Sequence, residues 1–392
     1  MNRNIRICAL IALSWFFCQL GFGEEIYDCP YRGQWKPGWS REHAPFDILK
    51  LLDRADAVWL GQINLVRTIS SEEGKPTKYK VTVAPTKILK GIIGGEQTFD
   101  WESWFPHIIL GKDMILFTKI EGERTIIFRA RTAYYKKKRG ISLYDVEDLP
   151  TDLIVDILSE LLSRKRGEKP NFEVGSRIIK EYESGKWRVD KACVSLAGAL
   201  GDPVCIQLLK KDVARRLNGQ WDYGRFEVSA RLLVKLQKAD GVRALLNSLV
   251  TSGARGSAKM GRMKESYVFF VSATEGGETA IDPIVWFVER HPEYLASAVG
   301  ALGQIATQPA REILRSWLLE RNNWKRTDVI RQSSYDSGLK LPISAFVVRA
   351  LLRCQDRKAQ PLLLRVAEHP EAPKALKQEA IAAAKRLAEL EN

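Results

Sequence analysis

Apolar and polar residues alternate along much of the chain between residues 57 and 128, and a period of two is typical of β-strands. Turn-like stretches containing Gly and Glu separate the alternating runs. We therefore expect short strands that form a small antiparallel sheet or barrel. The apolar positions of the five successive strands are Val58 and Leu60, then Tyr79, Val81 and Val83, then Phe99 and Trp101, then Ile115 and Phe117, then Ile126 and Phe128.

The period changes after Pro150, where an apolar stripe at helical spacing begins. A basic run followed by Gly167 is typical of a helix C-terminus. Helical patterns continue to the end of the chain, and the last of them, over residues 373–390, has the polar outer side of a terminal cap. The first stripe consists of Leu153, Ile154, Ile157, Leu158, Leu161 and Leu162.

A helix-turn-helix pattern recurs in the helical region, most clearly in the segment LAGALGDPVCIQLL from Leu196 to Leu209. Similar segments end at Leu246, Leu314 and Leu363, so the period is irregular. We expect an insertion at about 251–278 that contains a Gly-rich basic loop. We also expect solvent-facing Lys and Arg of the second helices to gather on one side of the repeats.

The turn Ala199 to Pro203, which reads ALGDP, resembles that of HEAT-like (armadillo-type) repeat proteins. In that family, antiparallel helix pairs stack because one pair cannot bury its apolar sides alone. The resemblance implies an all-α solenoid over residues 151–392 and recognition of a partner by an extended curved surface.

The β-domain has motifs of its own: ADAVWLG from Ala55 to Gly61, the later pair Lys90-Gly91, and LGKDMILF from Leu110 to Phe117. They resemble the OB-type domain of bacterial relatives of tissue inhibitors of metalloproteinases. Inhibitors of that family place an N-terminal cysteine on the zinc of the target enzyme. The resemblance implies an OB-like β-domain, and Cys29 is the residue for that role here.

The first residues have the features of an export signal. Arg3 and Arg6 precede an apolar run, and Gly21 and Gly23 provide small residues for cleavage. We expect residues 1–23 to be removed near Gly23, giving an exported, periplasmic or extracellular protein with no transmembrane span; a retained anchor is the alternative. The expected order is then a lead-in segment and short helix (24–56), the β-domain (57–150) and the helical domain (151–392), an α+β multidomain fold.

Composition and charge indicate the chemical class of the expected partner. With 45% hydrophobic and 28% charged residues, the 392-residue chain is neither disordered, collagenous nor a polytopic membrane protein. The net charge is +14, of which residues 151–392 contribute 39 basic against 29 acidic residues. This charge favours a protein or an anionic cell-envelope component as partner. Nucleic acid is disfavoured because export separates the protein from it.

Cysteines are too few for a disulfide scaffold after signal cleavage. Four remain in the mature chain: Cys29, Cys193, Cys205 and Cys354. Cys193 and Cys205 lie on either side of the predicted turn at Gly201, too far apart along the helices for a bridge. We expect them to be buried free thiols.

The usual catalytic and metal-binding signatures are absent from the sequence: it contains no His-Glu-x-x-His, Cys-x-x-Cys or Gly-x-Ser-x-Gly pattern. The four histidines, His43, His107, His291 and His369, are scattered. We therefore expect neither an enzyme nor a bound cofactor or metal.

Three groups of residues are candidates for partner binding. A basic run after two tyrosines suits an anionic polymer, a basic cluster lies in the expected insertion, and two tryptophans can form a stacking platform. The alternatives are a solvated connector, a flexible unpaired loop and core packing, respectively. The candidates are Lys136, Lys137, Lys138 and Arg139; Arg255, Lys259, Arg262 and Lys264; and Trp101 and Trp104.

The sequence thus predicts an exported, non-catalytic interaction protein that binds a protein or anionic partner through a helical-repeat surface. Two alternatives stay open. One is a metalloprotease-inhibitor-like protein that acts through the β-domain. The other is a nucleic-acid binder on a HEAT-like scaffold, suggested by the net charge alone.

Overall fold

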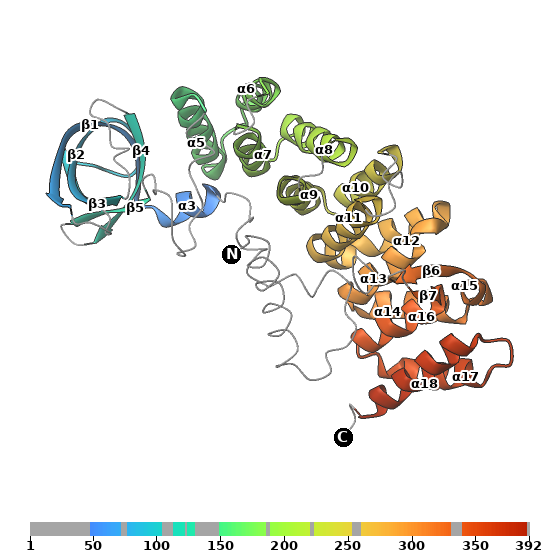
Figure 1. Ribbon diagram of the computed structural model, residues 1–392. Coiled ribbons are helices and arrows are strands. Elements are labelled where there is room, and N and C mark those ends of the chain that lie inside the picture. The colour runs from blue at the N-terminus through green and yellow to red at the C-terminus, as the bar shows by residue number, and fades with distance from the viewer. Residues whose placement is uncertain are drawn as a thin grey trace, which may run out of the picture.

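The last described strand of the β-domain ends at Arg129, and the first helix of the array begins at Thr151, after Pro150. The computed structural model describes residues 48–71, 77–103, 113–121, 124–129, 149–185, 189–219, 223–252, 260–330 and 339–389. An antiparallel sheet precedes a curved array of helices (Figure 1). The predicted α+β class is confirmed.

The β-domain contains the five strands that the alternating pattern predicts: β1 (Ala57–Ser70), β2 (Thr77–Lys90), β3 (Gln97–Ser103), β4 (Asp113–Glu121) and β5 (Arg124–Arg129). All pairs are antiparallel, and the strand order is β3-β2-β1-β4-β5. The sheet curls around a small core (Figure 1). That core consists of Ala57, Trp59, Ile63, Val81, Val83, Ile93, Phe99 and Leu116.

Gly61 allows the sheet to curl tightly where β1 passes β2. A Cβ atom at this position would lie 2.5 Å from the Trp59 ring and 2.6 Å from Cγ1 of Val83. The β1–β2 register also shifts between Leu60 and Gly61. A side chain at this position would therefore push the strand away from the ring that fills the sheet interior.

A short helix, α3 (Ile48–Arg54), joins the β-domain to the helices. Ile48 and Leu52 belong to the same apolar core as Phe117 of β4 and the helical residues that follow. The ammonium group of Lys90 donates to the backbone oxygens of Leu52, at 2.7 Å, and of Ala55. Lys90 therefore caps the C-terminal end of α3 and ties it to β2.

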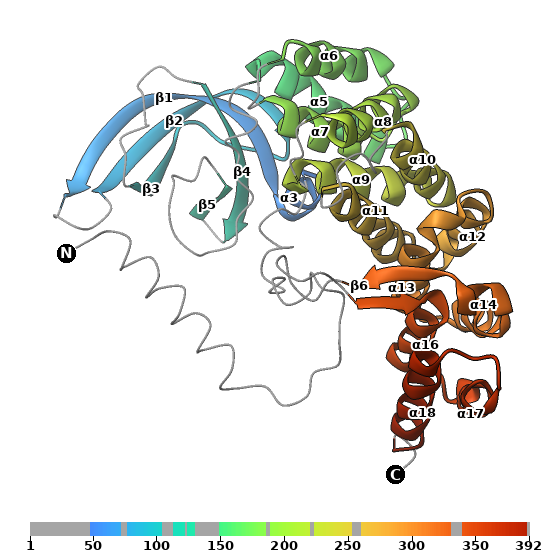
Figure 2. The ribbon, with the colours of Figure 1, turned by 45° about the vertical axis from the view of Figure 1, so that its right-hand side comes forward.

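The helical region forms two layers, visible in Figures 1 and 2. The inner layer, on the concave side, contains α5 (Thr151–Lys165), α7 (Val189–Leu200), α9 (Tyr223–Gln237), α11 (Met260–Gly276), α13 (Leu295–Ile305), α16 (Ile343–Arg353) and α18 (Lys374–Glu389). The outer layer contains α6 (Phe172–Glu183), α8 (Pro203–Asn218), α10 (Ala239–Thr251), α12 (Ile281–Arg290), α14 (Gln308–Leu319) and α17 (Gln360–Glu368). Short α15 (Arg321–Lys325) and a hairpin of β6 (Thr327–Ile330) and β7 (Leu339–Pro342) precede α16.

One continuous apolar core runs through this array, from Leu153 in α5 to Leu387 in α18. The stripe predicted from Leu153 to Leu162 is buried in α5, and Gly167 follows that helix with a φ of +79°. The terminal helix expected over residues 373–390 is α18. None of the described helices combines the length and the apolar character needed to cross a bilayer.

The turn between α7 and α8 explains the ALGDP sequence. Gly201 has a φ of +65°, which favours glycine. Asp202 is the N-cap of α8, and its Oδ1 accepts from the backbone nitrogen of Cys205 at 2.8 Å. Pro203 occupies the first helical turn. The guanidinium of Arg164, from α5, reaches Oδ2 of Asp202 at 3.3 Å and links this turn to the preceding helices.

The insertion expected at about 251–278 differs from the structure. Residues 260–276 form α11, an inner-layer helix in contact with α9 and α13. Its apolar residues Val268, Phe269 and Val271 are buried in the array core. Sequence reasoning missed this helix because Gly and Lys at its start hide the apolar run that follows. Residues 253–259 lie outside the described residues.

Replacing Asp202 with alanine is expected to lower the free energy of unfolding by about 2 to 4 kcal/mol, because both the N-cap and a buried ion pair are lost. The control Asp240→Ala removes an ion pair with Arg243. The carboxylate side chain of Asp240 is 72% exposed. This control is expected to cost less than about 1 kcal/mol. Urea unfolding measures both, and equal losses would contradict the assigned role of the turn.

Candidate functional site

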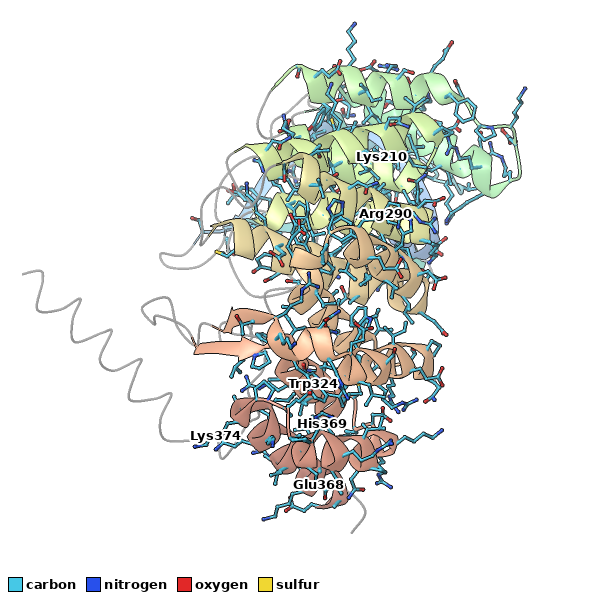
Figure 3. The ribbon with its side chains drawn as sticks, turned by 90° about the vertical axis from the view of Figure 1, so that its right-hand side faces the viewer. Lys210, Arg290, Trp324, Glu368, His369 and Lys374 are labelled. Atoms are coloured by element: carbon cyan, nitrogen blue, oxygen red, sulfur yellow. The ribbon has the colours of Figure 1, made fainter. Side chains whose placement is uncertain are left out.

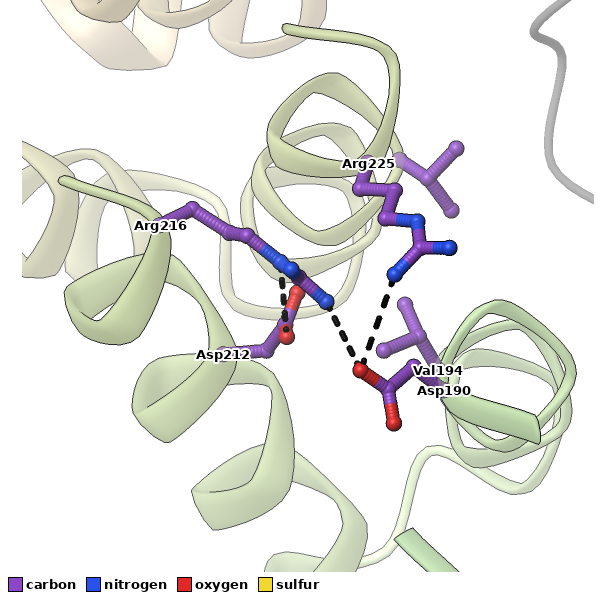
Figure 4. A pocket seen from close by; sticks show the side chains of 6 residues that line it. Asp190, Val194, Asp212, Arg216 and Arg225 are labelled. Carbon is purple, nitrogen blue, oxygen red and sulfur yellow. Dashed lines mark hydrogen bonds and ion pairs between the residues drawn. The ribbon is translucent and has the colours of Figure 1, made fainter. Parts of the chain in front are cut away.

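Among the described residues, a group of polar side chains, most of them buried, lies where α7, α8 and α9 meet (Figure 4). We call it the charge cluster. Its arginines and carboxylates come from three consecutive helices, and a tyrosine from α6 joins them. The members are Tyr182, Asp190, Asp212, Arg215, Arg216, Arg225 and Ser229.

Asp212 is the centre of the cluster. Its side chain is 1% exposed. The hydroxyl of Tyr182 donates to its Oδ1 at 2.6 Å, and the hydroxyl of Ser229 donates to its Oδ2. The Nε of Arg216 lies 3.3 Å from Oδ1. A buried carboxylate needs such partners, because an unpaired charge away from water is costly.

Asp190 pairs with the three arginines of the cluster. Its Oδ2 pairs with Arg215, with Arg216 at 3.0 Å and with Arg225 at 3.7 Å. Its Oδ1 is buried without a hydrogen-bond partner among the described residues. Three cations from α8 and α9 therefore converge on one carboxylate of α7, which fixes how these helices meet.

The electrostatic environment keeps Tyr182 in its neutral form. Burial raises the pKa of its hydroxyl well above the ordinary value, and the hydrogen bond to Asp212 acts in the same direction. The tyrosine is thus a permanent hydrogen-bond donor. The guanidinium of Arg215 also lies 4.7 Å from the centre of the Tyr182 ring.

A depression, shown in Figure 4, is lined by Val194, Val228 and four members of the charge cluster, Asp190, Asp212, Arg216 and Arg225. The side chains fill it and leave no room for a water molecule. Its arginines and carboxylates are engaged with one another. The arrangement suits a brace between helix pairs better than a binding pocket for a small molecule.

Further polar links follow the inner layer. Arg231 of α9 joins Glu227, at 2.7 Å, to Glu275 of α11. At the far end, Arg349 of α16 pairs with Glu379 of α18 at 2.6 Å. Each link joins neighbouring inner helices or stiffens one of them, so ion pairs that are at least partly buried recur as connectors along the array.

Most of the partner-binding candidates lie outside the described residues: Trp104, Lys136, Lys137, Lys138, Arg139, Arg255 and Lys259. Trp101 lies in β3, paired in register with Tyr79 of β2, and Arg262 lies in α11. Those two backbone positions are in different parts of the fold, so they do not form one surface.

The structure does not place Lys264 in a free basic loop. It lies in α11, is 9% exposed, and its ammonium group donates to the backbone oxygen of Leu217 near the C-terminal end of α8. Burial lowers its pKa. Lys264 therefore satisfies a helix end inside the array and is not available to a partner.

The expectation of buried free thiols is confirmed for Cys193 and Cys205, and Cys354 is also buried and free. Burial raises the pKa of Cys193 to about 12 and that of Cys354 to about 11. It raises the pKa of Cys205 as well. The thiolate, which is the reactive form, is suppressed at all three positions. Cys29 lies outside the described residues.

Within the described ranges, no three His, Cys, Asp or Glu side chains gather as metal ligands. Comparison of the chain with known protein families and with curated proteins gave no match.

Sequence reasoning missed the charge cluster, although one signal was present. Asp212 falls three and four residues after Leu209 and Leu208, on the apolar stripe of α8. A carboxylate on such a stripe indicates a buried ion pair. The identity of its partners could not be read from the sequence, because Tyr182 and Ser229 come from other helices.

Substituting Asp212 with alanine is expected to reduce the free energy of unfolding by about 3 to 5 kcal/mol, because it removes the carboxylate acceptor of two buried hydroxyls and one of the two carboxylates that pair with Arg216. The adjacent change Lys211→Ala removes only an exposed pair with Glu183. That control is expected to cost at most about 1 kcal/mol. Calorimetry or urea unfolding tests this; a small effect at Asp212 would show that the cluster does not brace the helices.

The thiols of Cys193, Cys205 and Cys354 are expected to resist alkylation in the folded protein at mildly alkaline pH and to react after denaturation. Their raised pKa values mean that the folded state binds these protons more tightly. Their contribution to stability is therefore complete below the ordinary thiol pKa of about 8.5 and declines as the pH rises above it. Peptide mass spectrometry after labelling measures this; rapid labelling of the native protein would contradict the assigned burial.

Proposed function

We propose that this chain is an exported, non-catalytic interaction protein whose helical array binds a protein or an anionic partner. The observation that carries the proposal is the two-layer array with one continuous core. Such an array exposes a long surface in which neighbouring helices contribute successive contact positions.

The use of charge inside the array supports this proposal. The buried carboxylates Asp190 and Asp202 are held by arginines of neighbouring helices. Asp212 is held by Arg216 of its own helix and by hydroxyls of α6 and α9. These polar side chains stabilise packing, and the depression beside the charge cluster is filled. The accessible chemistry of the described helices therefore lies on their solvent-facing sides, where a macromolecule can reach it.

Two finer assignments belong to the same proposal. The Gly201-Asp202-Pro203 turn, with its cap and its link to α5, supports a HEAT-like identity for the array. The strand order β3-β2-β1-β4-β5 supports an OB-type β-domain, which is a five-stranded, partly open barrel. Metalloprotease inhibition gains no support from the described residues, because Cys29 lies outside them.

The expectation that basic residues of the second helices gather on one side needs refinement. Several of them are paired with nearby acids: Arg177 with Asp152, Lys211 with Glu183, and Arg243 with Asp240. Exposed pairs of this kind neutralise much of the local field. The middle of the outer layer therefore offers mixed charge, which suits a protein partner with polar contacts.

Photo-crosslinking in cells tests the proposal. A photoreactive amino acid placed at Asn247 of α10 or at Lys235 of α9 is expected to form adducts with a distinct partner, because both positions are exposed on the array. The control position is Lys87 of β2, which is exposed on the β-domain. Adducts at Lys87 alone, or at no position, would contradict recognition by the array.

A further inference from the structure

Positive charge is concentrated at the C-terminal end of the array. Residues 321–392 contain 14 Lys and Arg against 8 Asp and Glu, a surplus of 6. The whole helical region from residue 151 has 39 basic and 29 acidic residues, a surplus of 10. More than half of the surplus therefore lies in less than a third of that region.

Ion pairs engage three of the eight acidic residues at this end. Asp356 is buried and pairs with Arg315 of α14 at 2.8 Å. Glu371 pairs with Arg321 at 3.3 Å, and Glu379 pairs with Arg349. These carboxylates are thus engaged with arginines from α14, α15 and α16, while the lysines of α18 add to the surplus.

The exposed lysines of α18 lie on one side of the helix, opposite its buried residues. The helix buries Leu376, Ala380, Ala383, Ala384 and Leu387. Lys374, Ile381 and Lys385 are exposed on the opposite side at helical spacing, and half-buried Lys377 flanks them. Ile381 is 55% exposed. α18 is the last of the described helices, and Lys374 lies at the edge of the array (Figure 3).

We propose that this basic side of α18, with Lys374, Lys377, Ile381 and Lys385, docks the protein onto an anionic membrane surface. The inference rests on the proposed function and names the class of partner for this end of the array. The proposed docking consists of contacts between α18 and the headgroups at the bilayer surface, and no helix is inserted into the bilayer.

The residue types favour a membrane over an acidic protein. Lysine is depleted in protein interfaces, where arginine is preferred because its guanidinium binds carboxylates through two hydrogen bonds. The lysines of α18 are spread over a helix of 16 residues, about 24 Å long. A flat layer of headgroups can meet all of them at once. The exposed Ile381 between them suits the boundary between headgroups and acyl chains.

Co-sedimentation of the full chain with vesicles tests the inference. Binding is expected to vesicles of phosphatidylcholine with about one third phosphatidylglycerol, and not to phosphatidylcholine alone, with release at high salt. Each lysine near such a surface strengthens binding by about fivefold. The triple change Lys374→Glu, Lys377→Glu and Lys385→Glu is therefore expected to weaken binding by roughly 100-fold or more.

A second triple change, Lys169→Glu, Lys180→Glu and Lys235→Glu, alters the net charge equally on α6, α9 and the loop before α6, where all three lysines are exposed. It is expected to have a much smaller effect. Circular dichroism and urea unfolding check that both variants fold. Equal weakening by both variants would overturn the assignment to α18. Failure to bind anionic vesicles, with array crosslinks at Asn247 and Lys235 intact, would point to an acidic protein and leave the proposed function standing.

Discussion

A carboxylate that leaves water on folding needs a cation beside it, and this requirement sets how the helices of the array meet. Asp202 is reached by Arg164, Asp356 by Arg315, and Asp190 by arginines of the next two helices. In each case the partners come from different helices. A shift of one helix along its neighbour would separate these pairs, whereas apolar contacts tolerate such a shift more readily.

This internal pairing also decides which charges reach solvent. Inside the array, arginines are engaged by buried or half-buried acids, as with Arg231 between Glu227 and Glu275. On α18, the exposed Lys374 and Lys385 lie opposite the buried side of the helix. The net charge of the sequence is therefore a poor guide to the surface in the middle of the array and a better one at its end.

Local patterns predicted the parts of the fold that depend on local physics. The alternation between residues 57 and 128 predicted the five strands, and the ALGDP sequence predicted the turn at Gly201 because glycine, cap and proline act within a few residues. The missed features depend on distant contacts. Lys264 looks like a surface lysine in sequence, and only the position of Leu217 in α8 makes it a buried helix cap. Asp212 likewise needed Tyr182 and Ser229 from other helices to define its role.

The junction at α3 affects how the chain unfolds. Ile48, Leu52 and Phe117 share one core with α5 and α7, and Lys90 holds the end of α3 from within the sheet. The β-domain and the first helices are therefore coupled, so that opening one exposes apolar surface of the other. Because they share this core, the sheet and the first helices are not expected to unfold as two independent units. An insertion or deletion at this junction would therefore disturb both architectures at once.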